Sequence, residues 1–471
     1  MNLSTVQGPE KLKQVKELLS SLEEDLKSKS LTTAQRVQTL LQLRQHGTVP
    51  TNADPIYSEH GIDILSKYGV EGETVDVRRA ALRCVANALL LVPQTRGYLM
   101  ATRRGGRLAE MLKCDSSDDE MVISRILFLL TYGTNQSEYE HILNQHGLGD
   151  SVYYQIVRHS KQFPKSGKPA LSQMDELALI DTLKLIFNTC KISDFKNGET
   201  VTGFEKAFSA SIPYIFKMIS RMEIPEQPLD GLLSYLINCL TVLDLKNESG
   251  HSFDSSPLFP PFDPNCNVDR LVLILDRATA TYKAEDLETK AAPLLHALIM
   301  MAEMAPEGPR KQMQALLLPE GNDRSEPIGQ SDTLPSRLLK LSTSPNKNLK
   351  ITISELLLLL SDNNAETLTQ NIGYGYAAGL LASRGMEIPQ TAGEAFATNG
   401  PAVNPVTGQR WDAEPQDTGP PMTQEEKERE AERLFVLFER ARANGLLNVE
   451  NPVRVAAQEG RLEELPDSDS D

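Results

Sequence analysis

Three glycines stand close together in the stretch NIGYGYAAGLLASRGM, at Gly373, Gly375 and Gly379. Glycines at the start of a helix can let backbone N–H groups surround a phosphate, so this stretch raises the possibility of nucleotide binding. A dinucleotide-binding loop has the spacing G-x-G-x-x-G and lies between a strand and a helix. Here the spacing is G-x-G-x-x-x-G, and the preceding helical pattern ends near Gln370. We therefore interpret Gly373 and Gly375 as a chain turn, and Gly379 as a point where two helices approach closely.

Other residue patterns that carry chemistry are missing from the sequence. There is no Walker A loop, no G-x-S-x-G and no H-E-x-x-H. His141 and His146 are five residues apart, a spacing that does not place them on one helical face. The carboxylates fall at helix starts and on polar faces, and Ser117 with Glu120 has the spacing of a capping box. We expect no enzyme, and no nucleotide, metal or other cofactor.

The composition limits the classes of partner. The chain has 471 residues and a net charge of -16, which argues against nucleic acid or an anionic membrane and favours a partner with a basic surface. The five cysteines have no C-x-x-C spacing, as expected for buried, reduced thiols in a cytosolic protein. The N-terminal residues MNLSTVQGPEKLKQ lack the apolar core of a signal peptide, and no apolar run is long enough to span a membrane. We expect a cytoplasmic protein.

The apolar residues recur with a helical period along most of the chain, and no alternating strand pattern stands out. Several of these helices are apolar around most of their circumference, so neighbours must cover them on both sides, as in stacked helical repeats. The sequence predicts an all-α fold of this kind. The helices are expected at about 10–28, 33–46, 75–92, 118–132, 172–190, 204–220, 228–244, 267–282, 287–304, 334–342 and 347–361.

A few polar residues interrupt these apolar helices. The stretches RCVANALL, KLIFNTCK and SYLINCLT each contain one asparagine, at Asn87, Asn188 and Asn238, although asparagine is unfavourable inside a helix. Arg44 and Arg125 also lie on helices that are otherwise apolar. The five could line an inner face where amides bind a ligand backbone and arginine binds a carboxylate. Alternatively, the asparagines bridge adjacent repeats and the arginines extend to the surface.

The C-terminal part of the sequence has a different composition. Residues 387–421 form a linker rich in Pro, Gly, Ala and Thr. A charged helix is predicted over 422–446, with a capping box at its start and an apolar stripe made by Leu434, Phe435 and Phe438. Residues 447–471 form an acidic tail for which we expect no fixed structure.

Three C-terminal stretches resemble one family. NIGYGYAAGLLASRG, VNPVTGQ and MTQEEKEREAERLFVLFERA, at the end of the chain, are similar to the C-terminal signature of the synembryn family. Upstream, QRVQTLLQLR, VDVRRAALRCVANALL, ISRILFLLTY, DTLKLIFNTC and NVDRLVLILDRATATY resemble helices of that family in the same order. The resemblance covers nearly the whole chain.

The resemblance implies a fold and a function. The fold is an armadillo- or HEAT-like helical-repeat superhelix over residues 1–386, followed by the linker and the C-terminal helix. The function is that of a cytosolic chaperone and non-receptor exchange factor for heterotrimeric G-protein α subunits, acting as a monomer in the cytoplasm and reaching the cell cortex through its partner. The concave face would hold the C-terminal helix of the α subunit through the five polar positions named above. The alternative is an armadillo scaffold that binds linear peptides and causes no nucleotide exchange.

The resemblance also assigns the C-terminal arm. Residues 403–409 and the stripe Leu434, Phe435 and Phe438 would reach over the nucleotide-binding domain of the α subunit. Some members carry an acidic Ser/Thr-rich run before the VNPVTG stretch, which is phosphorylated to raise activity. This chain has QTAGEAFATNGPA there instead, which leaves Ser468 and Ser470 as alternative acceptors.

Overall fold

The structure is a computed structural model. It describes residues 7–132, 136–192, 194–196, 199–201, 204–246, 256–387, 402–404, 407–414, 423, 425–427, 429–430, 432–433 and 435–436. The chain divides into two compact units, Met1–Ala413 and Glu414–Asp471.

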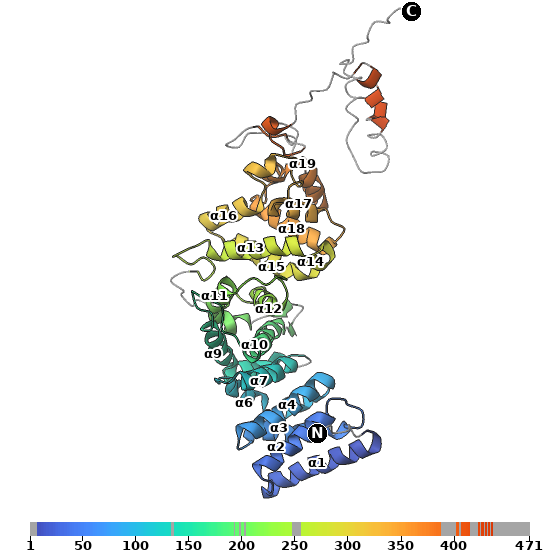
Figure 1. Cartoon of the computed structure of the whole chain (residues 1–471), viewed down its shortest axis with the longest axis vertical. Coiled ribbons are helices and arrows are strands. Elements are labelled where there is room, and N and C mark those ends of the chain that lie inside the picture. Colours follow the sequence, from blue (N-terminus) through green and yellow to red (C-terminus); the bar gives the residue numbers. More distant parts are fainter. Residues whose placement is uncertain are drawn as a thin grey trace, which may run out of the picture. The chain divides into compact units, whose positions relative to one another are not determined.

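The first unit is built around a series of helices in which each packs against the next, a series that we call the ladder (Figure 1). Its members are α2 (Thr33–His46), α4 (Val75–Leu91), α7 (Ser117–Leu130), α10 (Gln173–Lys191), α12 (Gly231–Leu240), α15 (Ala292–Met304) and α18 (Lys347–Leu360). The ladder helices are covered on several sides: α15, for example, buries Leu294, Leu295, Leu298 and Ile299. Such helices cannot be stable alone, so stacking supplies most of their free energy of folding.

The remaining helices flank the ladder. They are α1 (Gly8–Ser28), α3 (Glu59–Glu71), α5 (Thr95–Ala101), α6 (Gly105–Met111), α8 (Gln136–Gln145), α9 (Leu148–Ser160), α11 (Ile212–Arg221), α13 (Cys266–Thr281), α14 (Ala284–Lys290), α16 (Glu307–Leu317), α17 (Leu334–Ser342) and α19 (Ala365–Ser383), with 3-10 turns at Asp54–Tyr57, Glu205–Ser211, Gly321–Arg324 and Trp411–Ala413. Contacts such as α1 with α2, α3 with α4, α9 with α10 and α16 with α18 attach them to the ladder. This arrangement confirms the predicted all-α helical-repeat fold.

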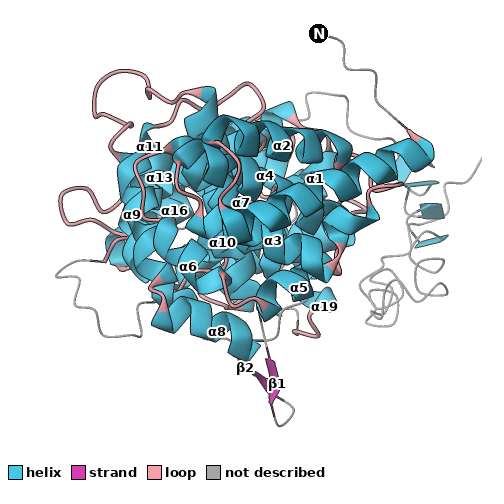
Figure 2. Ribbon diagram, turned by 90° about the horizontal axis from the view of Figure 1, so that it is seen from below, coloured by secondary structure: helices cyan, strands magenta, loops and turns pink. Residues whose placement is uncertain are grey.

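Two features differ from the sequence prediction. Residues 194–196 and 199–201 form a small antiparallel hairpin, β1 (Asp194–Lys196) and β2 (Glu199–Val201), although no strand pattern stood out in the sequence (Figure 2). Helices α3, α5, α6, α8, α9 and α16 were not predicted from the sequence. The sequence pattern of α9 was missed because two positions of its buried face carry polar residues. Gln155 and His159 are fully buried there, so no continuous apolar stripe marks the helix. Their partners lie about 40 residues away, at Leu112 and Glu120, so the local pattern does not reveal them.

The glycine stretch lies within α19. Gly373 has φ +72, which a residue with a side chain rarely adopts, and it divides α19 into two helical segments. The turn is therefore confirmed at Gly373, while Gly375 is helical. The prediction for Gly379 is wrong, since that residue is exposed and an added Cβ would meet no atom within 4 Å. The stretch follows directly on the first segment of α19 rather than on a strand, so the context of a dinucleotide loop does not exist here.

In the second unit, the described residues between 425 and 436 are helical, within the range predicted for the last helix. The Glu426 carboxylate accepts from the Thr423 N–H at 3.0 Å, and the Glu426 N–H donates to the Thr423 hydroxyl at 3.3 Å, which confirms the predicted capping box. Phe435 is half-buried. Leu434 and Phe438, like Ser468 and Ser470, lie outside the described residues. None of the helices that the structure describes combines the length and the apolar character that a bilayer crossing requires.

Candidate partner-binding face

The five polar residues singled out in the sequence lie on five successive helices of the ladder. Arg44 is on α2, Asn87 on α4, Arg125 on α7, Asn188 on α10 and Asn238 on α12. Arg44 is exposed, near the C-terminal end of its helix, and the other four are half-buried. The stacking thus places residues that lie roughly 40 to 60 positions apart in sequence on neighbouring helices of the ladder.

Arg125 is held by the neighbouring ladder helix. Its Nε donates to Oδ2 of Asp181 at 2.8 Å, and Nη2 lies 2.7 Å from the same oxygen. Lys184, one turn further along α10, has its Nζ 3.4 Å from Oδ1 of Asp181. Asp181 is 1% exposed, and this burial raises its pKa, while the two cations act in the opposite direction. The Arg125 side chain itself is 38% exposed, so its guanidinium can also reach a ligand.

The three asparagines differ in how they are bonded. The Asn188 amide donates to the Thr131 hydroxyl at 3.1 Å, which connects α10 to the end of α7. The Asn238 amide donates to the Ser234 carbonyl of its own helix at 2.8 Å. The Asn87 side chain makes no hydrogen bond within the described parts of the chain. Thus Asn188 does bridge two repeats, as the structural alternative predicted, but Asn87 and Asn238 do not.

Lys184 also joins an aromatic cluster that the sequence analysis missed. Its ammonium lies 5.8 Å from the ring centroid of Phe128 on α7 and 5.2 Å from that of Tyr235 on α12. Beyond Phe128, the ring of Tyr132 packs edge-on at 6.1 Å, with the Arg96 guanidinium 5.3 Å from its centroid. These residues could have been found by helical spacing, because Phe128 follows Arg125 by three positions and Tyr235 precedes Asn238 by three.

Large apolar side chains are exposed along the same helices. Leu90 is 58% exposed on α4, and Tyr132, just after α7, is 49% exposed. The others on ladder helices are Leu41, Val75, Leu91, Leu177 and Ile351. Exposed apolar groups that alternate with amides and cations are typical of a surface that binds an amphipathic helix or peptide.

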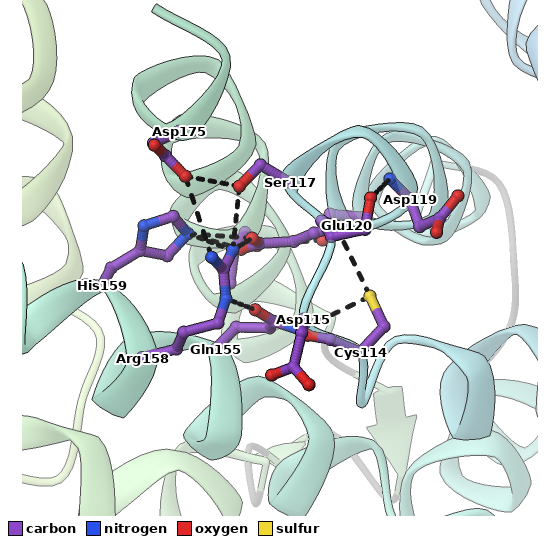
Figure 3. Close-up of polar contacts among 12 residues, drawn as sticks. Cys114, Asp115, Ser117, Asp119, Glu120, Gln155, Arg158, His159 and Asp175 are labelled. Carbon is purple, nitrogen blue, oxygen red and sulfur yellow. Dashed lines mark hydrogen bonds and ion pairs between the residues drawn. The ribbon is translucent and has the colours of Figure 1, made fainter. Parts of the chain in front are cut away.

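The interior of the α7–α10 contact carries a separate polar network (Figure 3). Glu120 is fully buried and accepts from the Thr182 hydroxyl at 2.7 Å, with the Nε2 of His159 at 2.8 Å and the Arg158 guanidinium also bonded to it. The predicted capping box of Ser117 and Glu120 is therefore wrong. The N-cap is Ser116, whose hydroxyl accepts from the Asp119 N–H, so Glu120 points into the core.

This network corrects the expectation that carboxylates lie only at helix starts and on polar faces. Besides Glu120, both Asp25 and Asp181 are buried. In Asp25, the bonds from Arg36 and Tyr68 outweigh burial and lower the carboxyl pKa. Each of these three carboxylates has an arginine partner within the first unit, and Glu120 joins three helices, so these groups are best explained as structural.

Asp175 forms the edge of the same network. Its carboxylate accepts from the hydroxyls of Ser117 and Ser172 and also from the Ser172 N–H, and this last bond is part of the capping box of α10. Burial alone would raise the pKa of Asp175, but these hydrogen bonds outweigh it and lower the pKa to about 2.

Two histidines expected to be apart are close together. The ring centroids of His141 and His146 are 5.3 Å apart, because α8 ends at Gln145 and His146 no longer follows the helical spacing. The His146 Nδ1 lies 2.9 Å from Glu110. Among the described residues, no group of three or more His, Cys, Asp or Glu side chains has the arrangement of a metal site.

The cysteines are free thiols, of which Cys84, Cys190 and Cys239 are buried and Cys114 and Cys266 are half-buried. The Cys84 Sγ donates to the Leu40 carbonyl at 3.3 Å, and burial raises its pKa to about 12. Such a thiol stays protonated and packs as a small apolar side chain.

Comparison with solved structures gives only weak likenesses. An engineered protein is 11% identical with a TM-score of 0.39, over 64% of this chain and 98% of that chain. A designed armadillo repeat protein is 12% identical with a TM-score of 0.32, over 75% of this chain and 100% of that chain. The helical-repeat fold rests on the helix contacts described above.

Comparison with protein families and curated sequences gives matches over nearly the whole chain. The model of a family described as "Guanine nucleotide exchange factor synembryn" matches residues 39–461. "Chaperone Ric-8A" of Macaca fascicularis is 26% identical over 98% of this chain and 92% of that protein, and its Pongo abelii counterpart is 27% identical over 96% and 91%. A synembryn-like chaperone of Schizosaccharomyces pombe is 29% identical over 33% of this chain and 32% of that protein. The chain belongs to the synembryn family of guanine nucleotide exchange factors.

Proposed function

We propose that this protein is a cytoplasmic chaperone and exchange factor for G-protein α subunits, and that its ladder binds the C-terminal helix of its partner. The observation that carries the proposal is the placement of Arg44, Asn87, Arg125, Asn188 and Asn238 on five successive helices. Membership of an exchange-factor family and the chaperone names of the relatives support it.

The chemistry of the ladder suits an amphipathic helix that ends in a carboxylate. Leu90 and Tyr132 offer apolar contact area, and the Asn87 amide can donate to carbonyls that a helix C-terminus leaves unpaired. Arg44 and Arg125 can bind a carboxylate. Arg125 would share its guanidinium between the ligand and Asp181, which fixes its orientation in advance.

Exchange follows from differential binding. When the ladder holds the C-terminal helix of a G-protein α subunit, that helix cannot stay packed on its own sheet, so the loop that it supports beside the guanine base loses order and GDP leaves. The ladder accelerates release only if it binds the opened form more tightly than the closed one, because equal affinity would shift no population. Chaperoning would use the same preference: the ladder binds an opened α subunit that has not yet bound a nucleotide.

The C-terminal arm would cover the nucleotide-binding domain that is exposed in this opened form. We assign this role to residues 403–409, which would contact the partner from their place in the first unit, and to the stripe that contains Leu434, Phe435 and Phe438. The proposed domains are the repeats at 1–386, the linker at 387–421, the C-terminal helix at 422–446 and the acidic tail at 447–471. The protein would act as a monomer that binds one α subunit.

Two measurements on the full chain test the proposal. Fluorescence anisotropy with a labelled peptide, whose sequence is the C-terminal helix of the α subunit, measures binding to the ladder. GDP release from a purified α subunit measures exchange. We expect both to be positive, and peptide binding to be weakened by Asn87→Leu. Peptide binding without faster GDP release would favour the scaffold alternative, and the absence of both would contradict the proposal.

A further inference from the structure

The part of the linker at residues 402–404 and 407–413, which we call the anchor, belongs to the first unit and bonds to the segment from Arg324 to Ile328. Val403 and Arg410 form an antiparallel bridge, and the Asn404 N–H donates to the Gln409 carbonyl at 2.8 Å. The Trp411 N–H donates to the Ala402 carbonyl at 2.9 Å. The anchor is therefore a closed turn with its own backbone hydrogen bonds.

Arg324 joins this turn to α19. Its Nη1 donates to the Gly408 carbonyl at 3.1 Å, and its Nη2 donates to the carbonyls of Gln370 and Asn371 at 3.0 and 2.9 Å. Those two carbonyls are free to accept because Gly373 interrupts the helix just after them. One planar guanidinium thus bonds two segments that are 37 residues apart in sequence, from Asn371 to Gly408.

The contact is reinforced around Arg324. The Arg410 N–H donates to the Arg324 carbonyl at 2.9 Å, and the Ile328 N–H donates to the Thr407 carbonyl at 3.0 Å. The Gln409 side chain, which is 6% exposed, donates to the Ser325 carbonyl at 2.9 Å. The anchor and the segment from Arg324 to Ile328 are consequently joined by several independent bonds.

Gly408 allows the close approach. Its φ is +67, and an added Cβ would lie 2.6 Å from the Cδ1 of Ile328, so both its backbone conformation and its surroundings favour glycine. The same Ile328 atom would lie 3.0 Å from a Cβ added at Gly373. The two glycines therefore let the turn, the break in α19 and Ile328 pack together.

We propose that Arg324 is a positioning residue for exchange: by attaching the anchor to α19, it fixes the point at Ala413 from which the chain continues into the second unit. This inference rests on the proposed function, because it assumes that the C-terminal arm takes part in nucleotide exchange. The effect of Arg324 on exchange would pass through the arm and not through peptide binding by the ladder. An arm that starts from a fixed point loses less conformational freedom when it binds a partner, and it covers a defined part of the surface.

The sole tryptophan of the chain lies in the anchor and reports on its attachment. Trp411 is 47% exposed. In the full chain, Arg324→Gln and Gly408→Val should shift Trp411 emission to longer wavelength and increase its quenching by acrylamide. The amide exchange rates of Arg410 and Trp411 should rise roughly tenfold, since the bonds that hold the turn in place are lost.

Matched controls separate anchoring from general damage. Arg310→Gln removes a guanidinium that donates to the Ala302 and Leu359 carbonyls within the repeats. Gly167→Val introduces a side chain at φ +98 where an added Cβ would meet no atom within 4 Å. Both should leave Trp411 emission unchanged. If Arg324→Gln does not fold, Gly408→Val alters the contact from the anchor side and leaves the repeats intact.

The functional test compares peptide binding with exchange. In both anchor variants, affinity for the C-terminal peptide should stay within about twofold of the wild type, while GDP release from an intact α subunit should slow roughly tenfold. Two results would overturn the positioning role of Arg324 and leave the proposed function standing. One is a GDP-release rate equal to that of the wild type in a variant whose anchor has detached. The other is an anchor that stays attached in Arg324→Gln. A wild-type chain that neither binds the peptide nor accelerates release would overturn the proposed function, and the positioning role with it.

Discussion

The guanidinium of Arg125 on α7 contacts the buried carboxylate of Asp181 on α10 at 2.7 Å, with more than a third of the Arg125 side chain left exposed. The pair connects two consecutive ladder helices, the same two that the Asn188 amide joins through Thr131. A residue proposed to bind a partner is thus also part of the packing. Experiments on it must separate affinity from stability.

Arg125→Ala should weaken peptide binding and also reduce stability. Asp181 would remain buried with only Lys184 near it, and an incompletely paired buried charge should cost about 2 kcal/mol. Urea denaturation and peptide anisotropy measure the two effects. The double variant Arg125→Ala/Asp181→Asn should recover most of the stability, because the buried charge is gone, but none of the affinity. Recovery of affinity in the double variant would show that Arg125 acts only through packing.

Asn188→Leu should lower affinity more than stability. The substitution removes one hydrogen bond to Thr131, whose own hydroxyl still donates to the Phe128 carbonyl, so the stability cost should be about 1 kcal/mol. Binding should weaken roughly tenfold if the amide contacts the partner. Asn346→Leu, which removes a similar bond to the Ala284 carbonyl outside this contact, serves as the control for stability alone. A large fall in melting temperature with unaltered affinity would support the purely structural interpretation of Asn188.

Truncation after Pro421 should slow GDP release but leave peptide binding nearly unchanged. The ladder and the anchor remain, so binding of the C-terminal peptide should stay within about twofold, whereas GDP release should slow because the last helix is gone. Peptide anisotropy and GDP release are measured side by side on truncated and full-length chains. Undiminished exchange by the truncated chain would show that the last helix has been assigned the wrong role.

Asp175 should make stability depend on pH in the acidic range. Its pKa in the folded state, about 2, is below the ordinary value of an aspartate, so the unfolded chain binds the proton more readily. The contribution is therefore complete above about pH 4 and is lost as the pH falls through about 2. Asp175→Asn should lose about 1 kcal/mol at neutral pH, allowing for solvent screening, and the difference from wild type should shrink toward pH 2.

Urea denaturation at a series of pH values measures this difference. Ser172→Ala removes one of the two hydroxyl donors and also the N-cap acceptor of the Asp175 N–H, so it should show an intermediate pH dependence together with a loss that is constant with pH. A difference between wild type and Asp175→Asn that stays constant from neutral pH to pH 2 would contradict the lowered pKa.

Helices with a strong apolar periodicity could be predicted from the sequence. α2, α10 and α18 begin and end within one or two residues of the sequence prediction, because their apolar periodicity is strong and is set by residues three and four apart. The choice of Asn87, Asn188 and Asn238 also needed only the chain, since a polar residue in an apolar helix is visible in the sequence. The break at Gly373 follows from the freedom of glycine alone.

The sequence by itself thus determined the helical-repeat fold, the polar residues that interrupt the ladder, and the family resemblance. Only the tertiary structure decided which polar groups are satisfied internally, since Glu120, Asp181 and Gln155 find partners about 40 to 60 residues away. It also decided that Arg324 bonds to Gly408, 84 residues later. The physical reason is that helix formation depends on neighbours along the chain, whereas a hydrogen bond between distant residues exists only after stacking has brought them together.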